Sequence, residues 1–100
     1  MDGFIEQQFN IECGRKIMEQ RRKMGVHQQN LALEVGVHRN TLSAWEAGER
    51  GVPLWMFLRI ADMLRCNLLH LLPSSSYTWG ELRRFTAERD PALTREEREA

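Results

Sequence analysis

The segment from residue 28 to residue 45, QQNLALEVGVHRNTLSAW, constrains the fold of this chain more than any other. In its first half, apolar residues recur at the spacing of one helical face: Leu31, Ala32 and Val35. Gly36 interrupts this pattern, and glycine adopts positive φ at little cost. After it, the residues expected to face inward are Val37, Leu42 and Trp45. The segment therefore predicts two short helices joined by a tight turn, with the small Ala32 at their close crossing.

The second of these helices has an opposite face of small and polar side chains. They occur at i, i+1, i+4, i+5 and i+8: Arg39, Asn40, Ser43, Ala44 and Ala47. A helix with one buried seam and such an outward row suits insertion into the major groove of DNA. Arginine can bond both O6 and N7 of guanine, asparagine can pair similarly with adenine, and an alanine can meet a thymine methyl group. The predicted base-reading residues are Arg39, Asn40, Ser43 and Ala44.

The pattern continues past the second helix. The string Gln28…Leu31-Ala32…Gly36-Val37…Thr41-Leu42-Ser43-Ala44-Trp45-Glu46-Ala47-Gly48 resembles the helix-turn-helix of lambda-repressor-like regulators, of the XRE or Cro/C1 type. The resemblance runs from about Cys13 to Leu72. It implies an all-α fold, a five-helix lambda-repressor-like helix-turn-helix domain, here with a short helical C-terminal extension. It also implies sequence-specific binding to double-stranded DNA.

The resemblance implies further roles around these two helices. Gln28 matches a glutamine that contacts phosphate and often braces a base-reading side chain in relatives. Other residues expected to contact the DNA backbone or to brace are Gln29, His27, His38, Thr41 and Arg50. His27 and His38 stand at helix N-caps where relatives have Ser or Thr, and imidazole is a poorer cap. In many relatives an arginine at the position of Arg21 pairs with the glutamate that is Glu46 here, so we expect a partly buried Arg21–Glu46 ion pair.

The flanking helices follow from apolar spacing. A first helix is expected from Cys13 to Met24, with one shared face: Cys13, Ile17, Arg21 and Met24. A fourth helix is expected with Pro53 in its first turn and with an inward stripe: Leu54, Phe57, Leu58, Ala61 and Leu64. Asn67 should cap a short fifth helix from Leu68 to Leu72, which Pro73 stops.

The chain divides into three parts. Residues 1–10 are an N-terminal arm or helix extension, and residues 11–73 are the helix-turn-helix domain. Residues 74–100 form a linker and a helical tail, beginning with three serines and containing two T-x-x-E capping boxes at 78–81 and 94–97. We expect this tail to be a dimerisation or packing element that covers an apolar surface within one subunit or across a dimer. The residues assigned to this packing are Trp55, Leu69, Trp79, Leu82 and Phe85.

Charge is distributed unevenly along the chain although its formal net value is zero. Residues 1–13 carry three acids and no base, whereas residues 14–50 carry seven bases and four acids, a net of −3 and +3. The presumed DNA-facing segment is therefore the basic part. Cys13 and Cys66 lack the spacing of a disulfide framework or a metal site, so we expect two small apolar residues in a reduced cytoplasm. No signal peptide and no membrane span is expected.

These features predict a cytoplasmic transcription regulator, nucleoid-associated when bound to DNA. A repressor that binds an inverted repeat as a homodimer is the leading hypothesis, a restriction-modification controller is a variant of it, and activation is equally compatible with the sequence. The alternative is an antitoxin whose tail, residues 77–100, binds a toxin as protein partner. An enzyme is not expected, since there is no nucleophile–base pair and no phosphate-binding glycine loop. No cofactor or metal is expected either.

Overall fold

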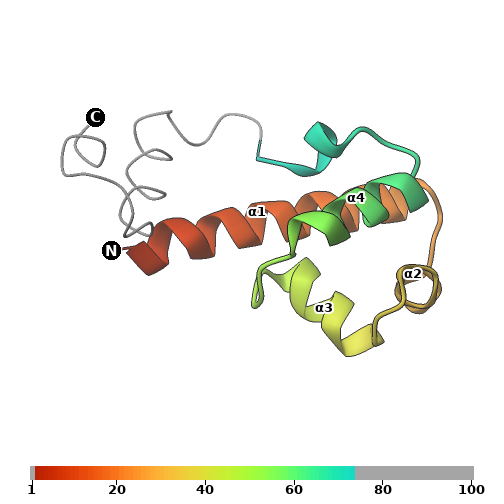
Figure 1. Ribbon diagram of the computed structural model, residues 1–100, viewed down its shortest axis with the longest axis horizontal. Helices are drawn as coiled ribbons and strands as arrows, with labels where there is room; N and C mark the ends of the chain where they lie inside the picture. Colours follow the sequence, from red (N-terminus) through yellow and green to blue (C-terminus); the bar gives the residue numbers. More distant parts are fainter. Residues whose placement is uncertain (1, 74–100) are drawn as a thin grey trace.

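The computed structural model describes residues 2–73 as a set of helices without strands (Figure 1). The elements are α1 (Asp2–Lys23), α2 (Gln28–Val35), α3 (Arg39–Ala47), α4 (Leu54–Met63) and the 3-10 helix η1 (Leu68–Leu71). The tail with its serine linker, its two capping boxes and its packing residues Trp79, Leu82 and Phe85 lies outside the described residues.

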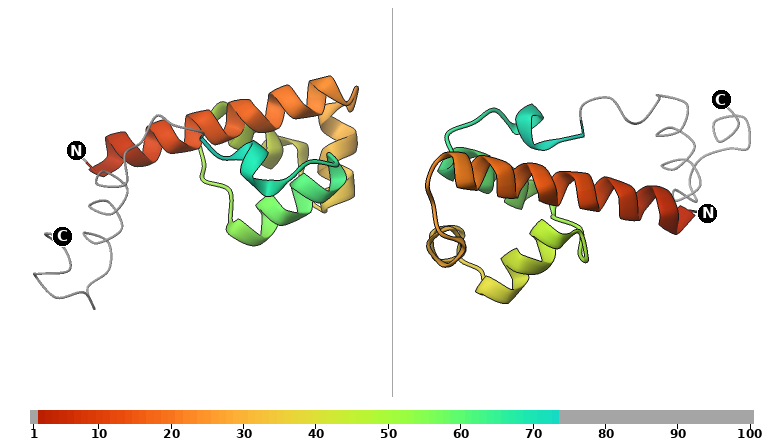
Figure 2. Two further views of the ribbon diagram at one scale, coloured as in Figure 1. Left: turned by 90° about the horizontal axis from the view of Figure 1, so that it is seen from above. Right: turned by 180° about the vertical axis from the view of Figure 1, so that it is seen from behind.

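Helix α1 is the long spine of the described domain (Figure 2). It packs on α3 and on η1, while α4 packs on α2 and on η1. The N-terminal half of α1 extends past the other described helices (Figure 1). Residues 2–10 and the helix expected from Cys13 thus form one continuous helix, and Phe9 packs against the edge of the core.

The core lies between these helices. It consists of apolar side chains from all of them: Cys13, Ile17, Leu31, Ala32, Val35, Leu42, Trp45, Met56, Phe57, Ile60, Ala61, Leu64 and Leu71. The inward residues expected for α2 and α3 are among them, and Val37 is partly buried against the same cluster.

Two of the expected apolar faces are wrong in part. Met24 is 42% exposed, because α1 ends at Lys23 and Gly25, at φ +71°, turns the chain away. On α4, Leu54 and Leu58 are 68% and 54% exposed. The buried residues of α4 are instead Met56, Phe57, Ile60 and Ala61.

The error on α4 has a simple cause. Eight of its ten residues are apolar, so hydrophobic spacing alone does not fix which side turns inward. Arg59 and Asp62 are both exposed, and these two charges mark the outer side. Pro53 is the N-cap of α4 and lies just before its first turn.

The fifth helix is also shorter and tighter than expected. Leu68–Leu71 forms a 3-10 helix, and Leu72 is already extended at φ −97° and ψ 153°. Four residues are a usual length for a 3-10 helix. Asn67 caps it as expected, since its Oδ1 accepts a hydrogen bond of 3.0 Å from the backbone N–H of Leu69.

Glycines allow α1 and α3 to approach closely. A Cβ atom on the buried Gly14 would lie 2.6 Å from the carbonyl oxygen of Glu46, so the two backbones cross at a distance that only glycine permits. Gly48 ends α3 at φ +77°, and a Cβ there would lie 2.5 Å from the Cα atom of Ile11. No local pattern in the sequence indicates this role of Gly14.

Candidate nucleic-acid interface

The corner between α2 and α3 places the outward face of α3 on the surface. Gly36 adopts φ +79°, and the backbone N–H of Val37 donates to the carbonyl of Ala32 at 2.9 Å, which closes α2. Ala32 itself is buried. This is the left-handed glycine cap that a sharp helix-to-helix turn requires.

Helix α3 presents the polar row that the sequence predicts. Arg39, Asn40 and Ser43 are exposed, whereas Thr41 and Ala44 are half-buried. His38 caps the helix, because its Nδ1 accepts a hydrogen bond of 3.0 Å from the backbone N–H of Asn40. At the start of α2, His27 makes no such bond. The expectation of a poorer imidazole cap therefore fits His27 and not His38.

The predicted Arg21–Glu46 ion pair is present and bidentate. Nε of Arg21 lies 2.8 Å from Oε2 of Glu46, and Nη2 lies 3.0 Å from Oε1. Nη1 donates to the carbonyl oxygen of Val26 at 2.9 Å. The two side chains are only 11% and 5% exposed. The pair thus ties the end of α1 to α3 beneath the surface.

Gln28 connects this buried pair to the surface. Its Nε2 donates to Oε1 of Glu46 at 3.2 Å, and its Oε1 accepts from Nε of Arg39 at 3.2 Å. A hydrogen-bonded chain therefore runs from Arg21 through Glu46 and Gln28 to the exposed Arg39. The bracing that the family resemblance implies for Gln28 corresponds to this contact.

Several of the predicted residues line one open hollow between α1 and the α2–α3 corner. It has a volume of about 480 Å³ and is lined by Met18, Arg21, Arg22, Gln28, Arg39, Ser43, Glu46 and Ala47. Arg22, which is exposed, and Met18, which is half-buried, were not among the predicted site residues. A second hollow of about 200 Å³, on the other side of Arg39, includes Gln29 and His38.

The remaining predicted contacts lie around these hollows. His27 precedes α2 and is exposed, as is Arg50 in the loop after α3. Neither lines the two hollows. Three predicted residues of α3 do not line them either: Asn40, Thr41 and Ala44. The structure therefore brings Arg21, Gln28, Arg39, Ser43 and Glu46 together around one hollow.

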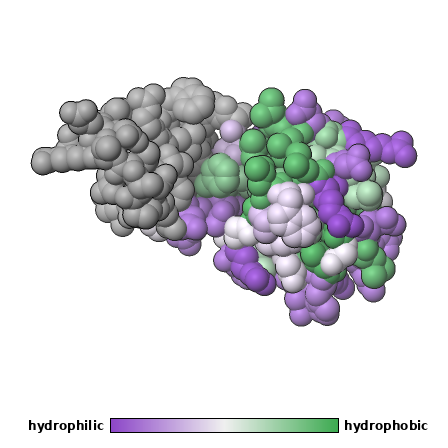
Figure 3. Space-filling view, in the orientation of Figure 1, coloured by the Kyte–Doolittle hydropathy of each residue, from purple (hydrophilic) through white to green (hydrophobic). Residues whose placement is uncertain are grey.

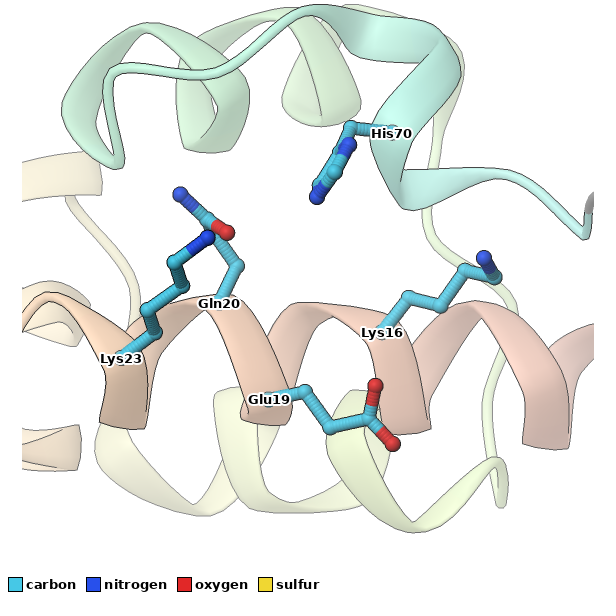
Figure 4. Close-up of a pocket in the computed structure, with 5 residues that line it drawn as sticks. All are labelled: Lys16, Glu19, Gln20, Lys23 and His70. Atoms are coloured by element: carbon cyan, nitrogen blue, oxygen red, sulfur yellow. The ribbon is translucent and has the colours of Figure 1, made fainter.

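A separate basic hollow of about 140 Å³ lies on the side of α1 that faces η1 (Figure 4). Lys16 and Lys23 point toward it from α1, and His70 points toward it from η1. Glu19 and Gln20 also line it. Arg15 holds Glu19 in an ion pair of 3.0 Å. Gln20 is buried and donates from Nε2 to the carbonyl oxygen of Leu64 at 3.2 Å.

Both cysteines are free thiols, of which Cys13 is buried and Cys66 is half-buried. Burial raises the pKa of the Cys13 thiol to about 12 and also raises the pKa of Cys66. Across residues 2–73, no group of three potential ligands could hold a metal ion. No helix in that part of the chain has the length and apolarity needed to span a bilayer.

Comparison with known families agrees with the helix-turn-helix geometry of α2 and α3. Residues 17–71 match the helix-turn-helix family. The chain belongs to this family, in its XRE-type branch. It is a DNA-binding transcription regulator. A comparison with curated protein sequences gave no match.

Solved structures show two kinds of similar proteins. The restriction-modification controller protein C.AhdI from Aeromonas hydrophila is 29% identical, with a TM-score of 0.59 over 62% of this chain and 94% of that chain. Hydroxypropylphosphonic acid epoxidase from S. wedmorenis is 26% identical, with a TM-score of 0.64 over 68% of this chain. The match spans only 36% of the epoxidase chain, so the likeness concerns about a third of that protein. Apo-HppE matches similarly, at 27% identity and a TM-score of 0.61 over 65% of this chain and 36% of that chain.

Proposed function

We propose that this regulator is a repressor that binds an inverted-repeat operator as a homodimer and reads its bases through α3. The observation that carries the proposal is the brace on Arg39, whose Nε is held by Gln28 at 3.2 Å. The exposed side chain of Arg39 is hydrogen-bonded through Gln28 to a buried network. A side chain that is already ordered in the free protein loses less conformational entropy when it binds DNA.

The brace leaves the right atoms of Arg39 available. Its Nε is engaged, so its two Nη groups can donate to O6 and N7 of a guanine. The remaining base contacts are assigned to Asn40, Ser43 and Ala44 in the same row. The side chain of Ala44 is a methyl group with no hydrogen-bonding atom, so its contact would be an apolar one with a thymine methyl group.

Contacts with the DNA backbone come from the helix ends around α3. The side-chain amide of Gln28 is engaged at both of its atoms, so a phosphate at this helix start would meet backbone N–H groups of α2. Gln29, His27, His38, Thr41 and Arg50 supply further donors. Contacts with the DNA backbone fix the register and orientation of the protein on the duplex, but they do not distinguish one base sequence from another.

The twofold dimer sets the operator geometry. Two recognition helices would enter successive major grooves about 34 Å apart, so the operator is an inverted repeat. Occupying such a site excludes polymerase, which makes repression the proposed outcome. The similarity to a restriction-modification controller protein supports a regulatory role of this kind. The proposal requires no catalytic group and no cofactor.

Selection of DNA from a randomised duplex pool tests this function. The full chain is incubated with the pool, and the retained duplexes are sequenced, alongside Arg39→Ala and a control, Arg15→Ala, whose arginine pairs with Glu19 on α1. We expect an enriched inverted repeat for the wild type and for Arg15→Ala, and loss of preference at one symmetric base pair for Arg39→Ala. Retention without any enriched sequence in the wild type would contradict the proposal.

A further inference from the structure

The small hollow between α1 and η1 is polar and basic, although the outer surface next to it is apolar. Hydrophobic side chains gather over α4 and η1 on the face shown in Figure 3, and Leu69 of η1 is 71% exposed. The hollow itself is lined by polar and charged side chains: Lys16, Glu19, Gln20, Lys23 and His70. Its volume of about 140 Å³ is below the roughly 300–1,000 Å³ of pockets for organic ligands, so its size suits a small ion.

The chain has only two lysines, Lys16 and Lys23, and both of them line this hollow. At 100° per residue they lie nearly on one line along α1, with Gln20 between them. Both side chains point toward the hollow, as does His70 from η1 (Figure 4). Within residues 2–73, none of these three side chains takes part in an ion pair. Hydrogen-bond donors from two elements therefore converge on one small space.

One acidic side chain, Glu19, also lines the hollow. Its Oε1 lies 3.0 Å from Nη1 of Arg15, which offsets its charge. The side chains of Arg15 and Glu19 are 54% and 57% exposed, so water screens this pair strongly. The two lysines therefore dominate the charge of the hollow, and their positive charge favours an anion.

Gln20 contributes an unpaired hydrogen-bond acceptor to the hollow. The residue is only 8% exposed, and its Nε2 donates to the carbonyl oxygen of Leu64 at 3.2 Å. This hydrogen bond fixes which branch of the amide carries the oxygen. Within residues 2–73, that oxygen accepts no hydrogen bond. A buried acceptor without a donor is costly, so a ligand in the hollow that carries a donor would relieve this cost.

We propose that this hollow binds inorganic phosphate as hydrogen phosphate. The unprotonated oxygens of the ion accept hydrogen bonds from the ammonium groups of Lys16 and Lys23, and the ring of His70 supplies a third donor. The P–OH group of the same ion donates to Oε1 of Gln20. The site thus combines several donors with one acceptor, which is the pattern that a protonated oxyanion requires.

The acceptor on Gln20 distinguishes hydrogen phosphate from other anions of similar shape. Sulfate and the phosphodiesters of DNA carry no proton at neutral pH. A phosphate monoester has a second pKa of about 6, so above neutral pH it is mostly a dianion without a proton. Each of these anions would place an unprotonated oxygen against the oxygen of Gln20, where two acceptors repel each other.

The phosphate site is separate from the surface proposed to bind DNA. Its residues include none of those that line the hollow at the α2–α3 corner, and none from α3. Phosphate binding therefore goes beyond the proposed function and does not depend on it.

An NMR titration of the full chain at constant ionic strength and about pH 7.5 tests the site with sodium phosphate, sodium sulfate and methyl phosphate. We expect phosphate to shift the side-chain amide signal of Gln20 saturably, with a dissociation constant of about 1 mM or below. Sulfate and methyl phosphate should bind about tenfold more weakly or worse. Equal affinity for the three ions, or shifts that do not saturate by about 20 mM phosphate, would show adventitious binding only and would overturn the inference.

Three variants test the roles of the side chains. Gln20→Leu keeps a similar volume and removes the acceptor, so phosphate affinity should fall to that of sulfate while sulfate affinity does not fall. Lys16→Gln should weaken the binding of both ions by about tenfold. Arg59→Gln, which removes an exposed cation of α4, is the control and should change neither affinity. A Gln20→Leu variant that still prefers phosphate to sulfate, or a Lys16→Gln variant with wild-type affinity, would contradict the proposed contacts.

Operator binding separates this site from a DNA contact. We expect Lys16→Gln to lower operator affinity no more than Arg59→Gln does, because the hollow lies outside the proposed DNA interface. A clearly larger loss in Lys16→Gln would mean that the hollow holds a phosphate of DNA, and this inference would fail. Failure of the proposed function would instead appear as wild-type DNA binding without sequence preference, whatever the affinity for phosphate.

Discussion

Nε of Arg39 donates to Oε1 of Gln28 at 3.2 Å, and this contact joins the exposed face of α3 to the core. The other atom of the Gln28 amide donates to Glu46, which is itself held by Arg21. The conformation of the outermost arginine is therefore coupled to an ion pair that is almost fully buried. Binding and stability can be tested separately at the two ends of this chain of contacts.

Replacing Gln28 by alanine should weaken specific DNA binding. Arg39 would lose its brace, and ordering a free arginine side chain on binding costs up to about 2 kcal/mol. We expect an operator dissociation constant raised by about tenfold, measured by fluorescence anisotropy. Asn30→Ala, at an exposed position of the same helix, is the control and should have a smaller effect. Equal losses in the two variants would show that the brace does not matter.

Breaking the Arg21–Glu46 pair should destabilise the fold. Arg21→Met leaves a carboxylate that is 5% exposed without its guanidinium, at a cost of about 3–5 kcal/mol. The double variant Arg21→Met/Glu46→Leu removes both charges, so its free energy of unfolding should fall by clearly less than the sum of the single changes. Urea denaturation provides these values. Additive losses would mean that the two side chains do not stabilise each other.

Two glycines of α1 should respond oppositely to alanine. Gly14→Ala places a Cβ against the backbone of Trp45 and Glu46, and overpacking of this kind costs about 1–3 kcal/mol or more. Gly3→Ala meets no atom within 4 Å and should stabilise the helix by about 0.5–1 kcal/mol. Thermal unfolding followed by circular dichroism distinguishes them. A Gly14→Ala variant as stable as the wild type would contradict the close crossing of α1 and α3.

Stability should fall at alkaline pH because of Cys13. Burial raises the pKa of its thiol from an ordinary value of 9.0 to about 12, so the folded chain retains a proton that the unfolded chain loses. This contribution is fully present below pH 9.0 and is lost as the pH rises toward about 12, by about 1.4 kcal/mol per pH unit. Urea denaturation at several pH values above 8 gives the slope.

Two alanine variants separate this effect from other alkaline titrations. Cys13→Ala should show a flatter decline of stability with pH than the wild type, although the variant is less stable at neutral pH because it leaves a cavity. Cys66→Ala should keep most of the wild-type slope, since that thiol is only half-buried. Parallel declines in the wild type and Cys13→Ala would exclude Cys13 as the cause.

Much of the α2–α3 corner could be predicted from the sequence because its constraints are local. The turn needs a glycine at Gly36, the crossing needs a small residue at Ala32, and the spacing of Leu42 and Trp45 fixes which side of α3 is buried. The expected fold class holds, and the Arg21–Glu46 pair was inferred from family resemblance. The roles of individual residues toward DNA remain predictions.

The structure differs from the sequence-based predictions in two situations. Either the local sequence is compatible with more than one structure, or the conformation is decided by residues far away in the chain. On α4, apolar residues surround the helix, so its orientation is decided by α2 and η1, and the two charges at Arg59 and Asp62 were the overlooked signal. The role of Gly14 depends on a backbone more than thirty residues away in α3, which no local pattern reveals. Leu68–Leu71 is too short for its spacing to separate a 3-10 helix from an α-helix.

The most direct measurement of the central claim is the ratio of operator affinity to nonspecific DNA affinity for wild type, Arg39→Ala and Arg50→Ala. If Arg39 reads a base, its removal should lower this ratio by an amount equivalent to about 1–3 kcal/mol and should leave nonspecific affinity nearly unchanged. Arg50→Ala should remove a phosphate contact and therefore weaken operator binding and nonspecific binding alike. It should also reduce the slope of log affinity against log salt concentration by about one. An unchanged ratio in Arg39→Ala would contradict base readout through α3.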